Sequence, residues 1–227
     1  MKTIAVIVAG GSGTRFGAEM PKQFLSLGGK PILMRTIEAF EKALAGGDHE
    51  IMVTLPAEQF GVWHDLCECH AFAVPHRVVP GGETRWHSVK NALDSIIDPA
   101  ILDVIAVHDG VRPLASVELI RRTLDTACRC GSAIPVVMLN DSVRQVNGEE
   151  NQALDRSTLR AVQTPQAFEA RLLLDAYRQP FEPVFTDDAS VVERMGHAVT
   201  LVEGEPANLK ITRPMDLALA EYLIKNA

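Results

Sequence analysis

Short runs of apolar, largely β-branched residues alternate along this chain with longer segments whose apolar residues recur every three or four positions. The runs are typical of buried strands, and the longer segments have the period of amphipathic helices. The predicted strands cover residues 4–9, 50–55, 77–79, 103–108, 132–137 and 198–203. Strands that alternate with helices build βαβ units. The pattern therefore predicts an α/β fold, as a single domain over residues 1–227 with a mostly parallel twisted sheet flanked by helices.

Some predicted helices have recognisable ends. One covers residues 31–45 and stops at two glycines, and another covers 84–97. A third begins around Pro214, where Thr212 can act as the cap and Asp216 in the first turn suits the helix dipole.

The segment at about 139–160 breaks this rhythm because it is polar and carries Asn147-Gly148 between short strand-like runs. Asn-Gly in that setting predicts a β-hairpin. A two-stranded hairpin alone is marginally stable in water, so it needs a surface to rest on. We expect an arm that is exchanged in a homodimer, and the alternative is a hairpin folded back on its own domain.

The formal net charge of −7 argues against binding to a nucleic acid polymer, which needs a basic face. The first apolar run is too short to span a membrane, so we expect a cytoplasmic protein without a membrane partner. The four cysteines form the pairs Cys67/Cys69 and Cys128/Cys130, each in a predicted helix or at its end. Residues two apart on a helix point to nearly opposite sides, which favours reduced thiols over a zinc site.

The first predicted strand runs into a glycine-rich loop, AGGSGTRFG at residues 9–17. Glycines let backbone amides approach a phosphate chain, but such a loop alone is weak evidence. A dinucleotide-binding fold needs an acidic residue at the end of its second strand, where this chain has Leu55-Pro56. A P-loop needs Gly-Lys-Ser/Thr, which the loop lacks. Both alternatives are therefore disfavoured.

Two cations, Arg15 inside the loop and Lys22 just after it, favour a triphosphate ligand. Nucleotidyl transfer requires a protein mainly to align the substrates and to stabilise charge on phosphorus and on the leaving group, which these two side chains can do. The alternative for Lys22 is a solvated side chain beside a turn-forming proline.

Asp109 follows the predicted strand 103–108 and so lies at the carboxyl edge of the sheet, where open α/β folds bind ligands. A single carboxylate there suits Mg²⁺, which completes its shell with water and substrate phosphate. The alternative is an aspartate that caps a turn and pairs with Arg112. We expect His108 to be a packed strand-end residue rather than a base.

Other clusters, at residues 81–85, 164–166, 186–190 and 208–212, are typical of binding surfaces, although each could serve only as a cap. Thr186 or Asp187, for example, is a good N-cap for a helix that runs through Met195.

Several motifs stand in order along the chain: the loop at 9–15, Pro21-Lys22-Gln23, Gly81-Gly82 with Arg85 and Ser88, His108-Asp109 with Arg112-Pro113, Thr164-Pro165-Gln166, and the residues 186–190 and 210–212. Together they resemble the 2-C-methyl-D-erythritol 4-phosphate cytidylyltransferase family over nearly the whole chain. The resemblance implies a Rossmann-like, nucleotidyltransferase-type domain with an interlocking β-arm. It also implies transfer of CMP from CTP to 2-C-methyl-D-erythritol 4-phosphate with release of pyrophosphate, in non-mevalonate isoprenoid biosynthesis, with Mg²⁺ or alternatively Mn²⁺.

The resemblance also implies a role for each motif residue. The triphosphate would be wrapped by Ala9, Gly10, Gly11, Ser12 and Gly13, and the nucleoside would lie beside Gly82, Glu83, Ser88, Asp109 and Gly110. Arg15 and Lys22 would stabilise the transition state, and Lys210 would touch the reacting phosphate. Arg156, on the arm, would grip the acceptor phosphate in the partner subunit's site, where the acceptor also meets Asp109, Arg112, Thr164, Thr186 and Lys210. Asp109 could face the metal, which substrate phosphates would mainly hold.

The chain departs from the family pattern at two places, with Glu83-Thr84 instead of a pair such as Asp-Glu and Gly110-Val111 instead of a frequent Ala-Ala. Neither departure removes a proposed catalytic group. The alternatives are a cytidylyltransferase for another polyol phosphate such as ribitol 5-phosphate, a sugar-1-phosphate nucleotidyltransferase, and a non-catalytic nucleotide-binding protein. The last would be expected to lose Arg15, Lys22 or Asp109, and this chain has all three.

Overall fold

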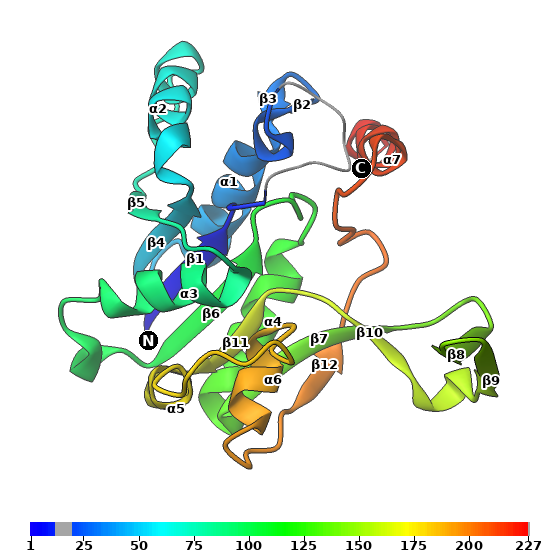
Figure 1. The fold of residues 1–227 in the computed structure, drawn as a ribbon. Helices are drawn as coiled ribbons and strands as arrows, with labels where there is room; N and C mark the ends of the chain where they lie inside the picture. The colour runs from blue at the N-terminus through cyan, green and yellow to red at the C-terminus, as the bar shows by residue number, and fades with distance from the viewer. Residues whose placement is uncertain (12–19, 227) are drawn as a thin grey trace.

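A mixed sheet forms the centre of the protein, whose computed structural model describes residues 1–11 and 20–226. The eight-stranded sheet has the order β10-β7-β11-β6-β1-β4-β5, with β12 pairing to β7 (Figure 1). Its strands are β1 (Lys2–Val8), β4 (Asp48–Leu55), β5 (Arg77–Pro80), β6 (Val104–Asp109), β7 (Ser132–Met138), β10 (Arg160–Val162), β11 (Gln166–Glu169) and β12 (Leu201–Glu203). Strand β1 pairs in parallel with β4 and β6, as β4 does with β5 and β7 with β12. The predicted α/β class with a mostly parallel sheet is confirmed.

Helices cover both faces of this sheet (Figure 1). They are α1 (Ile32–Leu44), α2 (Phe60–Cys69), α3 (Arg85–Asp94), α4 (Val117–Cys130), α5 (Ala170–Ala176), α6 (Asp188–Glu193) and α7 (Pro214–Lys225). The two helices predicted at 31–45 and 84–97 are α1 and α3, and α3 ends earlier than predicted, at Asp94. Of the four cysteines, which are all free thiols, Cys67 and Cys69 lie in α2, and Cys128 and Cys130 lie at the end of α4.

The strand β1 divides the core into two layers because its side chains alternate between the faces of the sheet. Ala5 and Ile7 lie in the cluster formed with α1, α2 and α4. Ile4 and Val6 lie in the cluster formed with α3, α5 and α6. Burial on both faces explains why β1 reads as one continuous apolar run, and it fixes the carboxyl end of the strand at the start of the glycine-rich loop.

The sheet contains strands that the hydrophobic pattern did not predict. Strand β11 lies between β6 and β7 and is antiparallel to both, and β10 is antiparallel to β7. Strand β12 begins at Leu201, whereas the pattern placed its start at 198. Two short strands, β2 (Ser26–Leu27) and β3 (Lys30–Pro31), pair with each other beside the start of α1.

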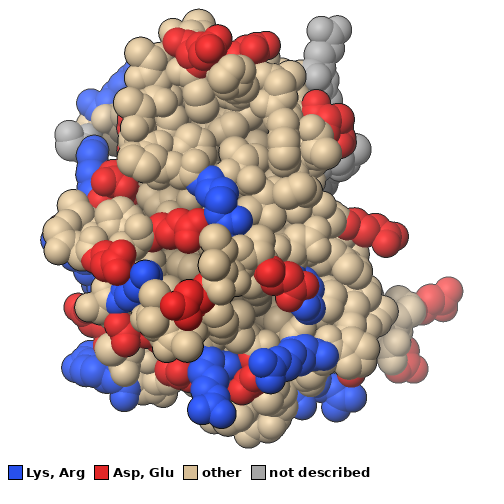
Figure 2. Space-filling view, turned by 90° about the vertical axis from the view of Figure 1, so that its left-hand side faces the viewer, with Lys and Arg blue, Asp and Glu red and all other residues tan. Residues whose placement is uncertain are grey.

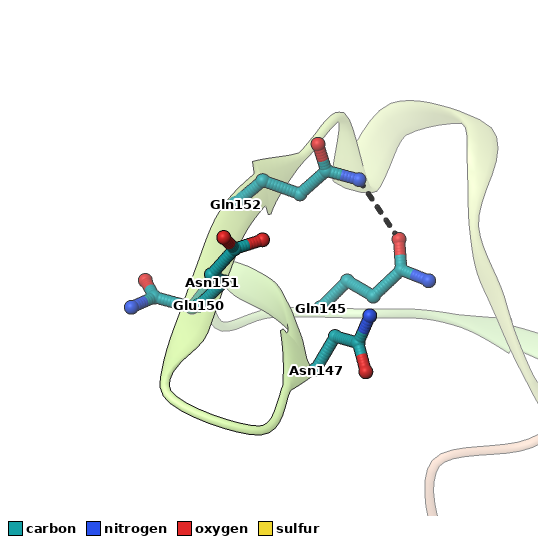
Figure 3. Close-up of a pocket in the computed structure, with 5 residues that line it drawn as sticks. All are labelled: Gln145, Asn147, Glu150, Asn151 and Gln152. Atoms are coloured by element: carbon teal, nitrogen blue, oxygen red, sulfur yellow. Dashed lines mark hydrogen bonds between the residues drawn. The ribbon is translucent and has the colours of Figure 1, made fainter.

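The predicted hairpin consists of β8 (Val143–Asn147) and β9 (Glu150–Leu154), which pair in antiparallel register. It forms a two-stranded sheet of its own and lies at the far end of the β7–β10 side of the molecule (Figure 1). Four amide side chains and the carboxylate of Glu150 line a hollow on it, and Gln152 donates a hydrogen bond of 2.9 Å to Gln145 (Figure 3). The short 3-10 helix Arg156–Thr158 follows β9.

Two helix starts differ from expectation. Helix α7 begins at Pro214 as predicted, but its cap residue is Arg213 and not Thr212. Thr212 and Arg213 instead donate backbone hydrogen bonds of 2.7 and 2.8 Å to the Asp216 carboxylate. Helix α6 is capped by Asp187, as one of the two predicted alternatives, and ends at Glu193, short of the predicted Met195.

The surface carries charges of both signs. On the face that lies to the left in Figure 1, Lys and Arg side chains lie among Asp and Glu side chains (Figure 2). Among residues 1–11 and 20–226, no helix combines the length and apolar character needed to cross a membrane.

Candidate active site

A cavity of about 430 Å³ opens at the carboxyl ends of β1 and β6, at the edge of the sheet that the sequence indicated. Backbone and side chains from separate segments line it: Val8, Ala9, Gly10, Gly11, Lys22, Gln23, Gly82, Glu83, Thr84, Arg85, Ser88, Asp109, Val111 and Lys210. The cavity therefore brings together the described residues to which the resemblance gives a nucleotide role, apart from Gly110. Gly110 adjoins it and donates a backbone hydrogen bond of 2.8 Å to Val8. Ser12, Gly13 and Arg15 lie outside the described residues.

Ser88 joins the two glycine segments of the cavity wall. Its hydroxyl accepts a hydrogen bond of 3.0 Å from the Gly82 amide and donates one of 3.0 Å to the Thr84 carbonyl. A Cβ atom at Gly82 would lie 2.4 Å from Cβ of His87, so no larger residue fits there without movement. A Cβ at Gly10 would lie 3.5 Å from the Ser88 hydroxyl, which is ordinary contact. The glycine at 82 is therefore a steric requirement of this wall.

Lys22 reaches the cavity from a short 3-10 helix, Lys22–Phe24, that is anchored on α2. The buried Gln23 side chain donates a hydrogen bond of 2.7 Å to Gln59, and the Phe24 ring stacks on Trp63 with 5.9 Å between centroids. These contacts fix the backbone from which Lys22 projects. Gly11 faces this side chain, because a Cβ at Gly11 would lie 3.6 Å from Cε of Lys22.

Asp109 is the electrostatic centre of the cavity. Its Oδ2 atom lies 3.1 Å from Nε of Arg112 and 3.1 Å from Nζ of Lys210, and its Oδ1 atom lies 3.7 Å from Nε of Arg85. Burial alone would raise the pKa of this carboxyl, but Arg85, Lys210 and Arg112 outweigh burial and hold the pKa well below its usual range. The expected pairing with Arg112 is present, and it is one of three. Three cations around one carboxylate leave this corner of the cavity positively charged and suited to phosphate.

Arg85 is itself held by a buried carboxylate. Its Nη2 atom lies 2.6 Å from Oδ2 of Asp188, whose Oδ1 atom accepts a hydrogen bond of 2.7 Å from the Tyr177 hydroxyl. Asp188 is fully buried, and Tyr177 is 1% exposed. Burial would lower the pKa of Arg85, but Asp188 and Asp109 outweigh burial and raise it. For Tyr177, burial and the neighbouring Asp188 both raise the pKa well above its usual range. The guanidinium thus stays charged and bridges two carboxylates that are distant in the chain, at positions 109 and 188.

The loop that carries Lys210 is tied to the strand region before β11 by buried amides. Gln163 donates to the Glu205 carbonyl at 2.8 Å, and its Oε1 atom accepts from the Glu205 amide at 3.1 Å. Asn208 is fully buried and donates to the Thr164 carbonyl at 2.8 Å. The Asn208 carbonyl in turn accepts from Nη1 of Arg112 at 2.8 Å. This frame sets the positions of both Arg112 and Lys210 beside Asp109.

His108 is a packed strand-end residue, as expected. It is fully buried, its ring lies 4.9 Å from the Phe40 ring between centroids, and burial lowers its pKa to about 4. A neutral imidazole in this position cannot exchange protons with the cavity near neutral pH.

Of the acceptor residues that the resemblance implies, Asp109 and Lys210 line the cavity, whereas Arg112, Arg156, Thr164 and Thr186 do not. Thr164 is 5% exposed, whereas Thr186 is exposed and directly precedes the cap of α6. Arg156 is exposed beyond the hairpin, where its guanidinium contacts the carbonyl of Asn140. Arg156 therefore does not contribute to the cavity of its own chain.

The residues of the cavity do not form a metal cage. Among the described residues, no group of three or more His, Cys, Asp or Glu side chains could hold a metal ion. Asp109 already faces three cations, which would repel a divalent ion placed directly on its carboxylate. A metal in this cavity fits as an ion carried by the phosphates of a bound nucleotide, as Mg²⁺ commonly is.

The sheet, the glycine-lined cavity and the cationic cluster define an α/β protein of the nucleotide-binding transferase class. The chain matches the model of the family described as 2-C-methyl-D-erythritol 4-phosphate cytidylyltransferase over residues 3–226. The enzyme of that name from Bacteroides thetaiotaomicron is 48% identical over 224 residues, which covers 99% of this chain and 100% of the relative. The one from Geobacillus thermodenitrificans is 37% identical and covers 97% and 96%.

Solved structures agree with these relatives. The crystal structure of 2-C-methyl-D-erythritol 4-phosphate cytidylyltransferase from Thermus thermophilus has a TM-score of 0.76 and 35% identity, covering 99% of this chain and 100% of that one. That of 4-diphosphocytidyl-2C-methyl-D-erythritol synthase from Anaerococcus prevotii has a TM-score of 0.82 and 27% identity, covering 98% and 96%. The chain belongs to the 2-C-methyl-D-erythritol 4-phosphate cytidylyltransferase family and is a nucleotidyltransferase of that family, which commonly uses a divalent metal.

Sequence reasoning missed the roles of Arg85, Asp188 and Tyr177. Arg85 belonged to a recognised motif, but nothing in the sequence linked it to Asp188. The available signal was its place at the start of a predicted helix, beside the glycines that line the cavity.

Proposed function

We propose that this protein transfers CMP from CTP to 2-C-methyl-D-erythritol 4-phosphate and releases pyrophosphate, as a step of non-mevalonate isoprenoid biosynthesis. Family membership supports the reaction. The single observation that carries the proposal is the cavity at the carboxyl edge of the sheet. Lys22, Arg85 and Lys210 line it together with glycines, and Arg112, outside the lining, pairs with Asp109.

In this proposal the chain acts by alignment and charge. The amides of Ala9 to Gly13 hold the triphosphate, and Lys22 with Arg15 stabilises negative charge on the α-phosphorus and on departing pyrophosphate. An oxygen of the acceptor phosphate forms the new bond to the α-phosphorus as the bond to pyrophosphate breaks, so no covalent enzyme intermediate is needed. Mg²⁺, or alternatively Mn²⁺, would be held by the phosphates and would neutralise part of their charge.

The acceptor phosphate would lie on the Asp109 side of the cavity. Lys210 is suited to meet it because its side chain is 41% exposed while its ammonium lies 3.1 Å from Asp109. Asp109 then serves as the group that holds Lys210 and Arg112 ready before the phosphate arrives. Thr186 would complete the pocket beside the start of α6.

We also propose a homodimer in which Arg156 enters the partner subunit's site. The hairpin makes no ladder with the main sheet, and an isolated hairpin is marginally stable. Beside it, the β7–β10–β12 edge exposes Met138 by 67%, Val162 by 46% and Leu201 by 55%. A second copy that covers this edge would support the arm and carry Arg156 to a cavity that it does not reach in its own chain.

The substrates are tested by pyrophosphate release. The protein is incubated with Mg²⁺, each of the four common nucleoside triphosphates, and either 2-C-methyl-D-erythritol 4-phosphate or ribitol 5-phosphate. Release with CTP and the first acceptor alone supports the proposal. Release with ribitol 5-phosphate alone would identify that compound as the acceptor instead. No release with any pair would contradict a transferase activity.

The exchanged arm is tested by mixing two variants, of which Lys22→Ala should lose turnover and Arg156→Ala should chiefly have a raised acceptor KM, at an acceptor concentration well below that KM. In a dimer of one Lys22→Ala subunit and one Arg156→Ala subunit, one of the two sites combines an intact Lys22 with an intact arm. If Arg156 acts in the partner's site, random remixing should restore about one quarter of wild-type activity. If it acts in its own chain, mixing restores nothing.

A further inference from the structure

A chain of hydrogen bonds runs behind the Asp109 carboxylate, on the side away from the cavity. The backbone amide of Asp109 lies 3.0 Å from the Thr164 hydroxyl oxygen. The same hydroxyl lies 3.0 Å from Nδ1 of His108, and Nε2 of His108 lies 3.1 Å from the carbonyl oxygen of Arg112. The groups that form this hydrogen-bond chain come from the end of β6, from the turn after it and from the segment before β11.

Burial lowers the pKa of His108 to about 4, so its ring is neutral near pH 7, and the donors and acceptors in this hydrogen-bond chain then permit one assignment. The Arg112 carbonyl can only accept, so Nε2 of His108 must carry a proton. Nδ1 of the neutral ring is then an acceptor, and the Thr164 hydroxyl donates its hydrogen to it. The Thr164 oxygen accepts from the Asp109 amide, so the proton order from Asp109 through Thr164 and His108 to Arg112 is fixed.

This assignment leaves the Thr164 hydroxyl with no hydrogen for a substrate. Its hydroxyl donates to His108, and its carbonyl accepts from Asn208 at 2.8 Å. Thr164 is 5% exposed and does not line the cavity, and His108 is fully buried against Phe40. Both side chains therefore belong to the support of the site and not to its open surface.

The hydrogen-bond chain holds both ends of the turn from Asp109 to Arg112, and this turn places the cations around the Asp109 carboxylate. Asp109 is held at its amide, Arg112 is held at its carbonyl, and the Arg112 amide donates to the Asp109 carbonyl at 3.0 Å. The guanidinium of Arg112 and the carboxylate of Asp109 then meet at 3.1 Å across the same turn. A shift of this turn would move the carboxylate against which Lys210 and Arg85 are arranged.

We propose that His108 and Thr164 are positioning residues for nucleotidyl transfer, and that Thr164 acts on the acceptor through Asp109 and Arg112 rather than by touching it. The kinetic consequence of this inference rests on the proposed function. The supporting role of Thr164 replaces the direct contact with the acceptor that the resemblance implies. The pair holds the turn in the geometry in which Asp109, Arg112 and Lys210 receive phosphate.

The kinetic test compares Thr164→Val, which keeps the shape and removes the hydroxyl, with Thr164→Ser, which keeps the hydroxyl. Because this turn holds Asp109, Arg112 and Lys210 for the acceptor phosphate, a lost buried hydrogen bond there should lower kcat/KM for the acceptor about tenfold in Thr164→Val. Thr164→Ser should remain within about twofold of wild type. A Thr164→Val enzyme that loses kcat/KM for the acceptor while the Asp109 amide resonance stays at its wild-type position would show direct contact with the acceptor and overturn the proposal.

A second measurement does not depend on activity. The nitrogen NMR resonances of the wild-type histidines report which ring nitrogen carries the proton. His108 should show a protonated Nε2 and a bare, hydrogen-bonded Nδ1, and the Asp109 amide resonance should move in Thr164→Val but not in Thr164→Ser. A proton on Nδ1 overturns the assignment. If the wild type catalyses no transfer, the proposed function fails, and this measurement still decides the hydrogen-bond chain.

Discussion

Replacing Arg85 by Met removes the guanidinium that joins Asp188 to Asp109 while keeping most of the apolar stem. Asp188 is fully buried, and among residues 1–11 and 20–226 its carboxylate would keep only the hydrogen bond from Tyr177. Asp109 would keep Arg112 and Lys210. The main consequence is therefore one buried carboxylate that has lost its countercharge.

Removing one partner of a buried ion pair costs about 3–5 kcal/mol, because the remaining charge stays away from water. The Arg85 side chain is 25% exposed, so water can enter part of the space it leaves. We therefore expect the lower end, about 3 kcal/mol. Replacing both residues, as Arg85→Met with Asp188→Leu, removes the stranded charge and should recover a large part of this loss.

Helix α3 supplies a matched control. Its Lys90 ammonium lies 2.6 Å from Oδ2 of Asp94, but that pair is exposed. Lys90→Met should cost at most about 0.5 kcal/mol, as is usual for an exposed pair one turn apart. Both variants carry the same change in a long cationic side chain on the same helix.

Urea unfolding followed by circular dichroism measures each free energy of unfolding, with the slope m checked for two-state behaviour. An Arg85→Met loss within about 0.5 kcal/mol of the Lys90→Met loss would refute the reasoning. A double variant that is simply additive would also refute it, because the stranded carboxylate would then carry no cost.

Further predictions concern single contacts. Gly82→Ala should cost about 1–3 kcal/mol and Gly10→Ala under about 1 kcal/mol, because a Cβ meets His87 at 2.4 Å in the first case and Ser88 at 3.5 Å in the second. Equal losses in urea unfolding would contradict the steric account. Tyr177→Phe should cost about 1–3 kcal/mol by leaving Oδ1 of Asp188 without its donor, while Tyr222→Phe, at a residue that is 64% exposed, should leave the unfolding midpoint unchanged. Asp216→Asn should destabilise by about 1 kcal/mol at pH 7. Burial acts to raise the pKa of Asp216, but hydrogen bonds from Thr212 and Arg213 outweigh burial and lower the pKa below its ordinary 3.8. Its contribution is therefore present above the unfolded-state pKa, so the difference between wild type and variant should shrink as pH falls below about 4, and a difference that grows there would contradict the sign.

The sequence predicted the parts of the fold that depend on local pattern. Strands β1, β4, β6 and β7 each contain an apolar run that is largely buried, and the hairpin was found through Asn147-Gly148. The position of Asp109 at the carboxyl edge followed from the end of β6. Each of these inferences uses residues that are close together in the chain.

The strand β11 could not be predicted in the same way. Its four residues, Gln166–Glu169, contain two polar side chains and no alternation. Gln166 is nevertheless 1% exposed, because its amide bonds to Asp187 and to the backbone of Ala189. Tertiary hydrogen bonds, which no local pattern records, stabilise it in the centre of the sheet.

The electrostatics of the site also escaped prediction. The sequence offered Arg112 as a partner for Asp109, since the two are three positions apart. Lys210 and Arg85 come from distant segments and meet Asp109 only in the folded chain. The arrangement also bears on metal binding, because the three cations beside Asp109 favour a divalent ion held by substrate phosphates over one bound directly to the carboxylate.

The central claim is that this cavity joins CMP to a polyol phosphate with Lys22 as a stabilising cation. Phosphorus NMR of CTP, Mg²⁺ and 2-C-methyl-D-erythritol 4-phosphate follows the α-phosphorus directly, with wild-type protein and with Lys22→Ala after its unfolding curve is matched to wild type. The wild type should form a cytidine diphosphate–polyol and pyrophosphate in equal amounts, and the variant should form neither at a comparable rate. Pyrophosphate without the joined product, or normal turnover by Lys22→Ala, would contradict it.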